Sequence, residues 1–441
     1  MSRTRRRRLP VKTQTADITE FTHDGRGIAH IAGKVTFITD ALPGETVRFR
    51  YTRQRRDYDE GVVSEVIAAA ETRVTPSCEH AAVCGGCRLQ HLAPAAQVTT
   101  KQAQLLENLS RIGKVEPQHQ LPPIVNDTPW GYRHKARLGV KYVHKKGRVL
   151  VGFRERQAPL IADIQQCPVL HPHVGTRLPA LARMIETLTL REQIPQIEVV
   201  MDDSQCVLIF RILTPIDEAN RARLREFARQ HDFIIYLQPA GPESCIPLEQ
   251  PAVLQNRLPE QQITLHFTPG DFTQVNHHIN RRMVSQALAL LKPGPADQVL
   301  DLFCGIGNFT LPLARHAGQV TGVEGDAGLV QRARENAARN GLTNVSVHAT
   351  NLYEDMAAAE WLQQRYTQAL LDPPRSGARP VLAHLPVLGV QQILYVSCYP
   401  GTLARDAGIL VHEHGYQLQS VGVMDMFPHT AHVESMALFN R

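Results

Sequence analysis

The chain has 441 residues, enough for two or three domains, and 43% of them are hydrophobic, which is ample for packed cores. No apolar run reaches the roughly 18 residues that cross a bilayer, and the basic start MSRTRRRRLP has no apolar stretch behind it, so we expect neither a membrane span nor a secretory signal peptide. The net charge is +6, and residues 1–60 hold 13 Lys and Arg against 8 Asp and Glu, which indicates an anionic polymer as partner.

The arginine-rich start fits a solvated arm as well as a phosphate-binding tail. After it, residues 14–72 are expected to form a small OB-like β-barrel, because the runs KVTFIT, ETVRFRYT and EGVVSEVI alternate with turn signals such as ALPGE. Barrels of this kind often bind nucleic acid on one face. Five arginines could charge that face, although a solvated strand face would carry them too: Arg48, Arg50, Arg53, Arg55 and Arg56.

Residues 73–270 are expected to form a central α+β unit. The stretch AAQVTTKQAQLLENLSRIG predicts a helix, and WGYRHKARLGVKYVHKKGRVLVGF predicts two strands joined by a hairpin at KKGR. Arg133, Lys135 and Arg137 alternate, so on a strand they would share one face. Such a basic face is compatible with RNA binding, although an exposed edge strand has the same pattern.

The central unit also holds a cysteine cluster. Cys78, Cys84 and Cys87 stand in the spacing C-x5-C-x2-C, and Cys167 is a fourth cysteine that fits with them. A chain without a secretory signal is expected in the cytoplasm, where clustered cysteines indicate metal binding or catalysis rather than disulfides. Four thiolates suit zinc and an iron–sulfur centre equally well, and the spacing does not decide between them.

Residues 271–441 alternate apolar strands with helices, the pattern of a doubly wound, mostly parallel sheet. QVLDLFCGIGNFTLPLA predicts a strand, a glycine turn and a helix, in which Gly305 and Gly307 let the backbone approach a ligand closely. Later strands end in Glu324, Asn351 and Asp372, and ligands of open α/β sheets bind at such carboxyl ends. The series resembles a class I S-adenosylmethionine-dependent methyltransferase. A dehydrogenase-type site is disfavoured because the third glycine of its fingerprint is missing.

Cys398 ends the apolar strand QILYVSC and precedes a turn into a helix, whose N-terminus is expected to lower the thiol pKa. An inert cysteine is the alternative, and we expect Cys304, Cys206 and Cys245 to be of that structural kind. A thiolate beside a methyl donor suggests pyrimidine methylation, because its addition to C6 makes C5 nucleophilic toward the sulfonium methyl. A general base must then remove the C5 proton. Glu434 is the candidate, although a surface carboxylate would look the same.

Five segments resemble the RNA uracil-C5 methyltransferases, and the resemblance covers nearly the whole chain: FTQVN (272–276), DLFCGIGNF (301–309), LDPPRSG (371–377), VSCYPGTLARD (396–406) and HTAHVES (429–435). The resemblance implies S-adenosyl-L-methionine as methyl donor, Cys398 as nucleophile and Glu434 as base. It also implies that Phe272 stacks on a base near the target. Many relatives have a small residue in place of Pro374, so the pocket shape beside Asp372 is left open. The cofactor pocket would be lined by Gln274, Phe303, Asn308, Glu324, Asn351 and Asp372.

The cysteine motif is similar to that of the ribosomal-RNA branch of this family. By that resemblance, a structural 4Fe-4S iron–sulfur cluster would be bound by Cys78, Cys84, Cys87 and Cys167. The N-terminal barrel resembles a TRAM domain, an RNA-binding module that the transfer-RNA branch generally lacks. Both features favour a uridine of 23S rRNA or its precursor as the substrate. We expect the enzyme to be a monomer and to have no membrane partner.

Two further functions compete with this one. A cytosine-C5 methyltransferase would use the same thiolate chemistry, but that group generally has proline before its cysteine, and Ser397 stands there. An RNA-binding protein with a vestigial catalytic domain is disfavoured by the intact Cys398 and Glu434.

Overall fold

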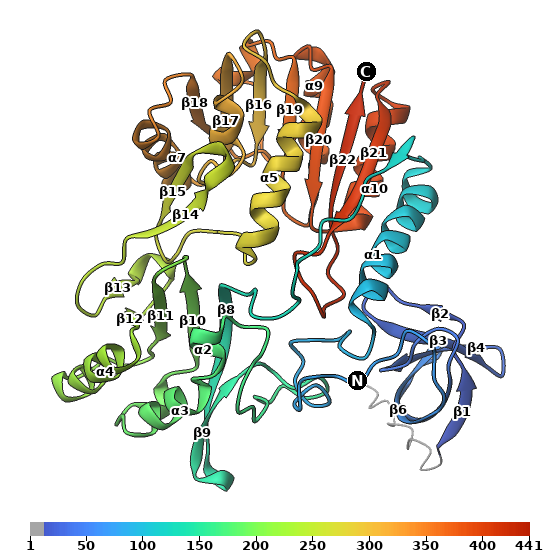
Figure 1. The fold of residues 1–441 in the computed structure, drawn as a ribbon, viewed down its shortest axis with the longest axis vertical. Coiled ribbons are helices and arrows are strands. Elements are labelled where there is room, and N and C mark those ends of the chain that lie inside the picture. The colour runs from blue at the N-terminus through green and yellow to red at the C-terminus, as the bar shows by residue number, and fades with distance from the viewer. Residues whose placement is uncertain (1–12) are drawn as a thin grey trace, which may run out of the picture.

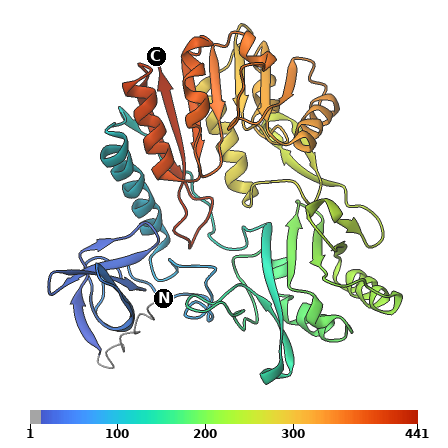
Figure 2. The same ribbon diagram turned by 180° about the vertical axis from the view of Figure 1, so that it is seen from behind.

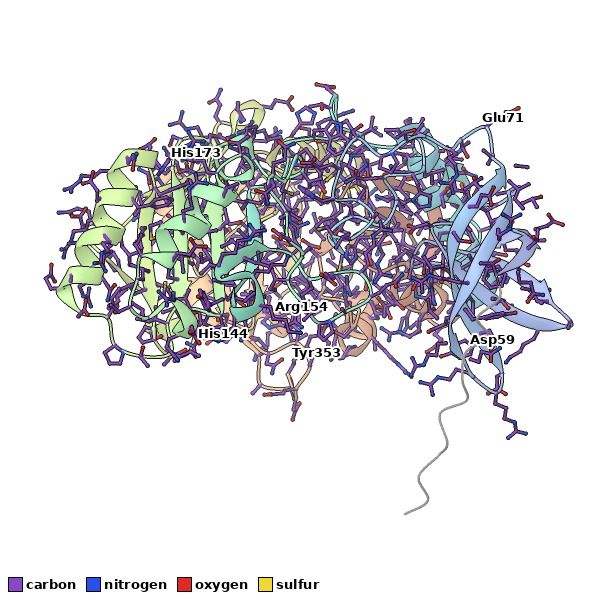
Figure 3. All side chains as sticks on the ribbon, turned by 90° about the horizontal axis from the view of Figure 1, so that it is seen from below. Asp59, Glu71, His144, Arg154, His173 and Tyr353 are labelled. Atoms are coloured by element: carbon purple, nitrogen blue, oxygen red, sulfur yellow. The ribbon has the colours of Figure 1, made fainter. Side chains whose placement is uncertain are left out.

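The computed structural model describes residues 13–441, so the arginine-rich start lies outside the described residues. The chain forms an N-terminal barrel, a central mixed sheet and a C-terminal doubly wound sheet (Figure 1). Seen from below, the barrel with Asp59 and Glu71 lies at one end, and the central unit with His144 and His173 at the other (Figure 3). Along residues 13–441 no helix is both long enough and apolar enough to cross a membrane.

The N-terminal unit is a curved sheet, as the sequence predicts. Val47 and Phe49 are fully buried and alternate with the exposed Arg48, so one face of their strand forms the core. The turn at Ala32 and Gly33 has positive φ at both residues, the type I′ geometry that matches strand twist. The strands are β1 (Gln14–Asp17), β2 (Glu20–Phe21), β3 (Arg26–Ile31), β4 (Lys34–Thr39), β5 (Thr46–Gln54) and β6 (Tyr58–Ala68), in the order β1-β5-β6-β4-β3-β2.

The central unit is a mixed sheet with three helices. The predicted hairpin at KKGR joins β8 to β9. Arg133 precedes β8, so only Lys135 and Arg137 share its face, and both lie near Glu198, at 3.8 and 3.6 Å. The expectation that all three basic residues share one strand face is therefore met only for Lys135 and Arg137. The elements are β8 (Lys135–Val143), β9 (Arg148–Gly152), α2 (Pro172–Gly175), α3 (Leu178–Glu186), β10 (Gln196–Met201), β11 (Cys206–Arg211), α4 (Glu218–His231), β12 (Ile234–Gln238) and β13 (Ile246–Pro247).

The C-terminal unit is the predicted doubly wound sheet, with parallel strands followed by an antiparallel pair at one side. The order of its strands is β18-β17-β16-β19-β20-β22-β21-β7. The strands are β16 (Gln298–Leu302), β17 (Gln319–Glu324), β18 (Val345–Ala349), β19 (Gln368–Leu371), β20 (Gln392–Ser397), β21 (Gln417–Met424) and β22 (Glu434–Asn440). The helices are α5 (His277–Leu291), α6 (Thr310–Ala314), α7 (Ala327–Arg339), α8 (Arg379–Leu382), α9 (His384–Val387) and α10 (Pro400–His412).

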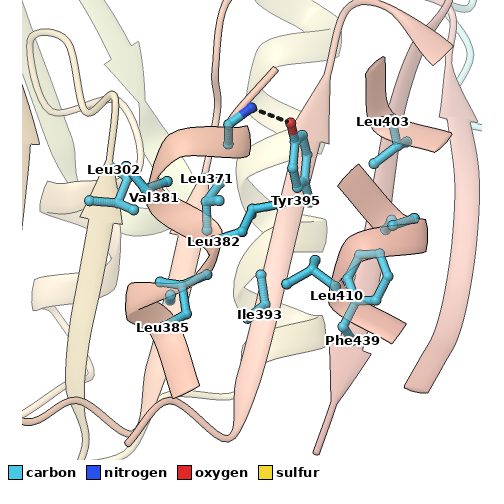
Figure 4. Packing of buried hydrophobic residues seen from close by; sticks show 14 of the residues in the cluster. Leu302, Leu371, Val381, Leu382, Leu385, Ile393, Tyr395, Leu403, Leu410 and Phe439 are labelled. Atoms are coloured by element: carbon cyan, nitrogen blue, oxygen red, sulfur yellow. Dashed lines mark hydrogen bonds between the residues drawn. The ribbon is translucent and has the colours of Figure 1, made fainter. Parts of the chain in front are cut away.

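The apolar strands of this sheet are buried because helices cover them. Leu382 and Leu385 pack over Leu371 and Ile393 in the core between sheet and helices (Figure 4). One polar group in this core is satisfied locally: the hydroxyl of Tyr395 accepts a hydrogen bond from the backbone N–H of Ala378 at 3.0 Å and donates to Asp406 at 2.7 Å. This network anchors the chain that follows LDPPRSG to the sheet.

Two segments of the expected central unit pack with the C-terminal sheet instead. The helix α1 (Pro94–Asn108) and the strand β7 (His119–Gln120) lie along its edge, where β7 pairs with β21. Gly113, after α1, approaches α10 so closely that an added Cβ would lie 2.4 Å from the carbonyl of Ala404. The hairpin of β14 (Leu254–Leu258) and β15 (Ile263–Phe267) shares the core under α5. Residues 73–270 therefore do not form a single packing unit, whereas the core of the barrel lies wholly before residue 73.

Candidate active site

The predicted cofactor residues meet at the carboxyl edge of the C-terminal sheet. Phe303 follows β16, Glu324 ends β17 and Asp372 follows β19, and these three strands run parallel. Together with the other three predicted residues they line one cavity of about 730 Å³: Gln274, Asn308 and Asn351. All six side chains predicted for cofactor binding thus face the same space.

The glycine turn and Glu324 form the floor of this cavity. Gly305 and Gly307 have φ of +55° and +96°, values that an L residue adopts at a cost. One oxygen of Glu324 accepts a hydrogen bond from the N–H of Gly305 at 3.0 Å, and the other accepts from Gly325 at 2.7 Å and Asp326 at 3.0 Å. The carboxylate is therefore held in a fixed orientation at the end of its strand.

The loop FTQVN is fixed by the start of α5. The side chain of Asn276 caps this helix by accepting from the N–H of Ile279 at 3.2 Å. Asn308, which also lines the cavity, exchanges two hydrogen bonds of 2.9 Å with Asn280 of the same helix. Phe272 projects from the loop with 68% of its surface exposed, and it lines the cavity.

Cys398 and Glu434 lie side by side at the edge of this cavity. In the antiparallel pairing of β20 with β22, Ser397 is opposite Ser435, so the next residues outward are Cys398 and Glu434. Both line the cavity that holds the predicted cofactor residues. The sheet register therefore brings together the two residues to which the sequence assigned the chemistry.

Burial shifts the pKa of both groups upward. The pKa of the Cys398 thiol is raised to about 11 by burial and by the negative charges of Glu434 and Asp372. This contradicts the expectation that the helix N-terminus lowers it, because burial disfavours the thiolate and the two carboxylates repel it. Burial and Asp372 also raise the pKa of Glu434 to about 8. A carboxyl with such a pKa can exchange a proton near neutral pH.

A second cavity of about 520 Å³ adjoins the first, and Cys398 also lines this one. Arg133, Arg375 and His432 are likewise shared by the two cavities. Arg375 lies with Nη2 2.9 Å from Nδ1 of His432, and burial together with Arg375 lowers the pKa of His432 to about 4. The neutral imidazole therefore accepts from the guanidinium at the junction of the cavities.

The second cavity also contains the cysteine cluster. Its wall includes all four predicted metal ligands, which are half-buried free thiols: Cys78, Cys84, Cys87 and Cys167. The N–H of Gly86 points at Sγ of Cys84 at 3.4 Å. Within residues 13–441, however, no three or more His, Cys, Asp or Glu side chains are gathered closely enough to hold a metal ion as they stand. The metal site therefore stays a prediction.

The other three cysteines lie away from the cluster. Cys304 and Cys206 are buried, whereas Cys245 is half-buried and lines neither cavity. Pattern reasoning missed Arg375, His432 and Tyr353 as cavity residues. Arg375 and Tyr353 follow the identified Asp372 and Asn351 by three and two positions, and His432 precedes Glu434 by two. The signal was therefore their place in the loops after β19, β18 and β21, respectively.

Two family models match the chain. The model described as tRNA (uracil-5-)-methyltransferase matches residues 100–441, and the model of the TRAM domain matches residues 7–63. The first match spans most of the central unit and the whole C-terminal unit, and the second falls on the N-terminal unit. Together they confirm the predicted family resemblance.

Full-length relatives are similar as well. The chain is 51% identical over 441 residues to 23S rRNA (uracil(1939)-C(5))-methyltransferase RlmD of Methylococcus capsulatus, covering 100% of this chain and 99% of the relative. It is 52% identical over 440 residues to the protein of the same name from Alkalilimnicola ehrlichii, covering 99% and 98%.

One solved structure shares the fold over nearly the whole chain. The structure of Pyrococcus abyssi tRNA (uracil-54, C5)-methyltransferase with S-adenosyl-L-homocysteine is similar with a TM-score of 0.73, and the match covers 96% of this chain and 99% of that one. At 22% identity this likeness concerns the fold alone.

Proposed function

Because the chain belongs to the tRNA (uracil-5-)-methyltransferase family, we propose that it transfers a methyl group from S-adenosyl-L-methionine to C5 of uridine 1939 in 23S rRNA, giving 5-methyluridine. The observation that carries the proposal is the pair of Cys398 and Glu434 beside the cavity that Glu324 and Asp372 line. The relatives named for this uridine are about half identical over the full length, which supports the target.

The two side chains divide the reaction between them. The Cys398 thiol gives up its proton to solvent, Sγ forms a bond to C6 of the uracil, and the electron pair of the C5–C6 double bond passes into an enolate. C5 then forms a bond to the methyl group as the methyl–sulfur bond of the donor breaks, which leaves S-adenosyl-L-homocysteine. Glu434 removes the C5 proton, and the electrons of that C–H bond restore the double bond and expel the Cys398 thiolate. The pKa of about 8 for Glu434 suits a base that works near neutral pH.

The chain's own residues fit S-adenosyl-L-methionine. Glu324 presents a fixed carboxylate at the second strand end, where ribose hydroxyls are bound in folds of this type. Gly305 leaves open space at its Cβ position, so backbone can approach the ligand. Phe303 and Tyr353 place their rings 5.9 Å apart on the same wall. We assign Gln274, Asn308, Asn351 and Asp372 to the same pocket.

The residue types and the shared cavity of the four cysteines, rather than their present spacing, suit an iron–sulfur cluster. Four thiols are the donor set of a 4Fe-4S centre, and peptide N–H groups such as that of Gly86 stabilise sulfur ligands. Gly85 meets the carbonyl of Arg154 so closely that a Cβ would lie 2.9 Å away, which keeps the cysteine loop against the segment that follows β9. We propose that Cys78, Cys84, Cys87 and Cys167 bind the cluster and that it supports the fold.

The nucleophile is tested with the purified enzyme and a 23S rRNA fragment that contains the target uridine. Cys398→Ala is expected to lower methyl transfer by at least about 10⁴-fold, because the addition to C6 has no substitute, while RNA affinity is retained. Cys245→Ala, which changes a half-buried cysteine outside both cavities, serves as the matched control. Methyl transfer by Cys398→Ala at a rate near that of the wild type would refute the assignment.

The cluster is tested by metal analysis of protein purified without oxygen. We expect iron and sulfide with an absorbance band in the visible range, and their loss in Cys87→Ser. Stoichiometric zinc without sulfide would instead identify a zinc site.

A further inference from the structure

The loop that joins β21 to β22, residues 425–433, forms part of the wall around Cys398. We call it the hairpin loop. It descends from the sheet toward the space between the barrel and the central unit (Figure 2). Thr430, Ala431 and Val433 line the second cavity, and His432 lines both. The place of this loop therefore decides the shape of the site in which a uracil must meet Cys398.

The hairpin loop is held in a strained conformation at His429. This residue has a φ of +65°, in the left-handed region that side chains other than glycine rarely adopt. Its carbonyl accepts from the N–H groups of Arg88 and Leu89, both at 2.9 Å. Such a conformation persists only where surrounding contacts impose it, and here they come from the segment directly after Cys87.

Gln97 of α1 completes these contacts. Its side chain is fully buried, and Oε1 accepts from the N–H of His429 at 2.8 Å. Nε2 donates to the carbonyl of Leu89 at 3.0 Å and to that of Leu92 at 2.8 Å. One amide thus accepts from the hairpin loop and donates to residues 89–92, and its Nε2 also lies 3.3 Å from Nδ1 of His429. Lys101 of the same helix holds the loop as well, through Asp425 and the carbonyl of Phe427, but its hydrogen bonds do not reach residues 89–92.

We propose that Gln97 is a positioning residue that locks the hairpin loop against residues 88–92, so that the wall beside Cys398 is formed before the RNA binds. The inference rests on the proposed function. Gln97 lines neither cavity and touches no reacting group, so it acts through His429. Gln97 also links the cysteine segment to the active site, because it hydrogen-bonds to Leu89 and Leu92, which come shortly after Cys87 in the chain.

The contacts of Gln97 with the hairpin loop affect the rate of turnover rather than the affinity for RNA. A displaced loop carries His432 away from Arg375 and opens the wall at Cys398, and small errors in the placement of reacting atoms are costly. The loop sequence DMFPHTAHV contains no Lys or Arg, and phosphate contacts supply most of the affinity for RNA. A loosened loop therefore lowers kcat with little change in KM for the RNA.

Trp130 provides a direct reporter. Its ring stacks on His429 at a centroid distance of 4.0 Å, and the only other tryptophan, Trp361, is buried elsewhere in the core.

We compare Gln97→Met, which fills the same volume without hydrogen bonds, with Gln97→Ala and the wild type. Subtracting the spectrum of Trp130→Phe isolates the emission of Trp130. We expect a red shift in both Gln97 variants and a fall of kcat by about tenfold to hundredfold, with KM for the RNA within about threefold.

The matched control is Gln102→Met on the same helix, whose amide contacts Gln120 and not the loop. It is expected to leave both the emission and kcat unchanged. An unshifted emission in Gln97→Met, or a shift with unchanged kcat, overturns the inference. Absence of methyl transfer in the wild type and in Gln102→Met would instead reject the proposed function, and the fluorescence would still report whether the loop is locked.

Discussion

Cys398 and Glu434 are thirty-six positions apart in the sequence and become neighbours only through the pairing of β20 with β22. Strand patterns could identify each residue at the end of an apolar segment, since chemistry in open sheets lies at strand ends. They could not give the register that sets the two side by side. The direction of the Cys398 pKa was predicted wrongly because helix position is visible in a sequence, whereas burial and the approach of two carboxylates are not.

Replacing the base separates the two halves of the reaction. Glu434→Gln is expected to trap an RNA–protein adduct, because methyl transfer proceeds and elimination lacks its base, and product release is expected to fall by about 10²–10⁴-fold. The adduct is measured as a slow-migrating band on a denaturing gel. Wild-type rates of release from the variant would remove Glu434 from its role.

The pH dependence of this residue has a defined sign. Glu434 is an active base only when unprotonated, so with its pKa at about 8 turnover of the wild type is expected to rise between pH 6 and pH 9. The same raised pKa favours the folded state at low pH, and this contribution is lost as the pH rises toward 8. Urea unfolding at pH 6 and 8.5 is expected to show a smaller loss of stability in Glu434→Gln than in the wild type. An equal loss in both proteins would contradict the shift.

At the level of elements, the position of α1 in the fold was the feature predicted least well from the sequence. Its helical character was predicted correctly from its pattern. Its docking onto α10 and the C-terminal sheet was not, because the contacts that attach it are long-range. They include the near approach of Gly113 to Ala404 and the pair of Lys101 with Asp425, which lie 324 positions apart.

The buried pair of Lys101 and Asp425 gives a stability prediction. Lys101 is only 2% exposed, and its Nζ donates to Asp425 at 2.7 Å and to the carbonyl of Phe427 at 3.0 Å. Lys101→Met leaves a buried carboxylate unpaired and is expected to cost roughly 3–5 kcal/mol of unfolding free energy. Lys101→Met with Asp425→Leu is expected to recover much of that loss. The measurement is urea unfolding, and a double variant as unstable as the single one would contradict this account.

At the level of the whole molecule, one side chain joins the barrel, the cysteine loop and the central unit. Arg156 donates to the carbonyls of Cys84 at 3.1 Å and Cys87 at 2.6 Å, and it pairs with Asp40 of the barrel. The sequence predicted three units and the RNA-binding character of the first, because each has its own local pattern. It could not predict this junction, since arginines in loops carry no signal of their partners.

Removing this junction is expected to loosen the barrel. In Arg156→Ala the linker at residues 69–77 is expected to be cut faster by protease. The affinity for the 23S rRNA fragment is expected to fall by about threefold to tenfold, because the barrel is no longer held in a fixed orientation relative to the rest of the protein. Arg154→Ala is the matched control, because Arg154 is exposed and its side chain makes no ion pair among the described residues. Equal proteolysis of the two variants would show that Arg156 does not hold the barrel.

The central claim is that this chain methylates C5 of one uridine through Cys398. It is tested most directly by nucleoside mass spectrometry of 23S rRNA from cells that lack the gene, complemented with the wild type or with Cys398→Ala. We predict that one methyl group disappears at uridine 1939, returns with the wild type and stays absent with Cys398→Ala. Unchanged methylation of that uridine in cells without the gene would contradict the claim.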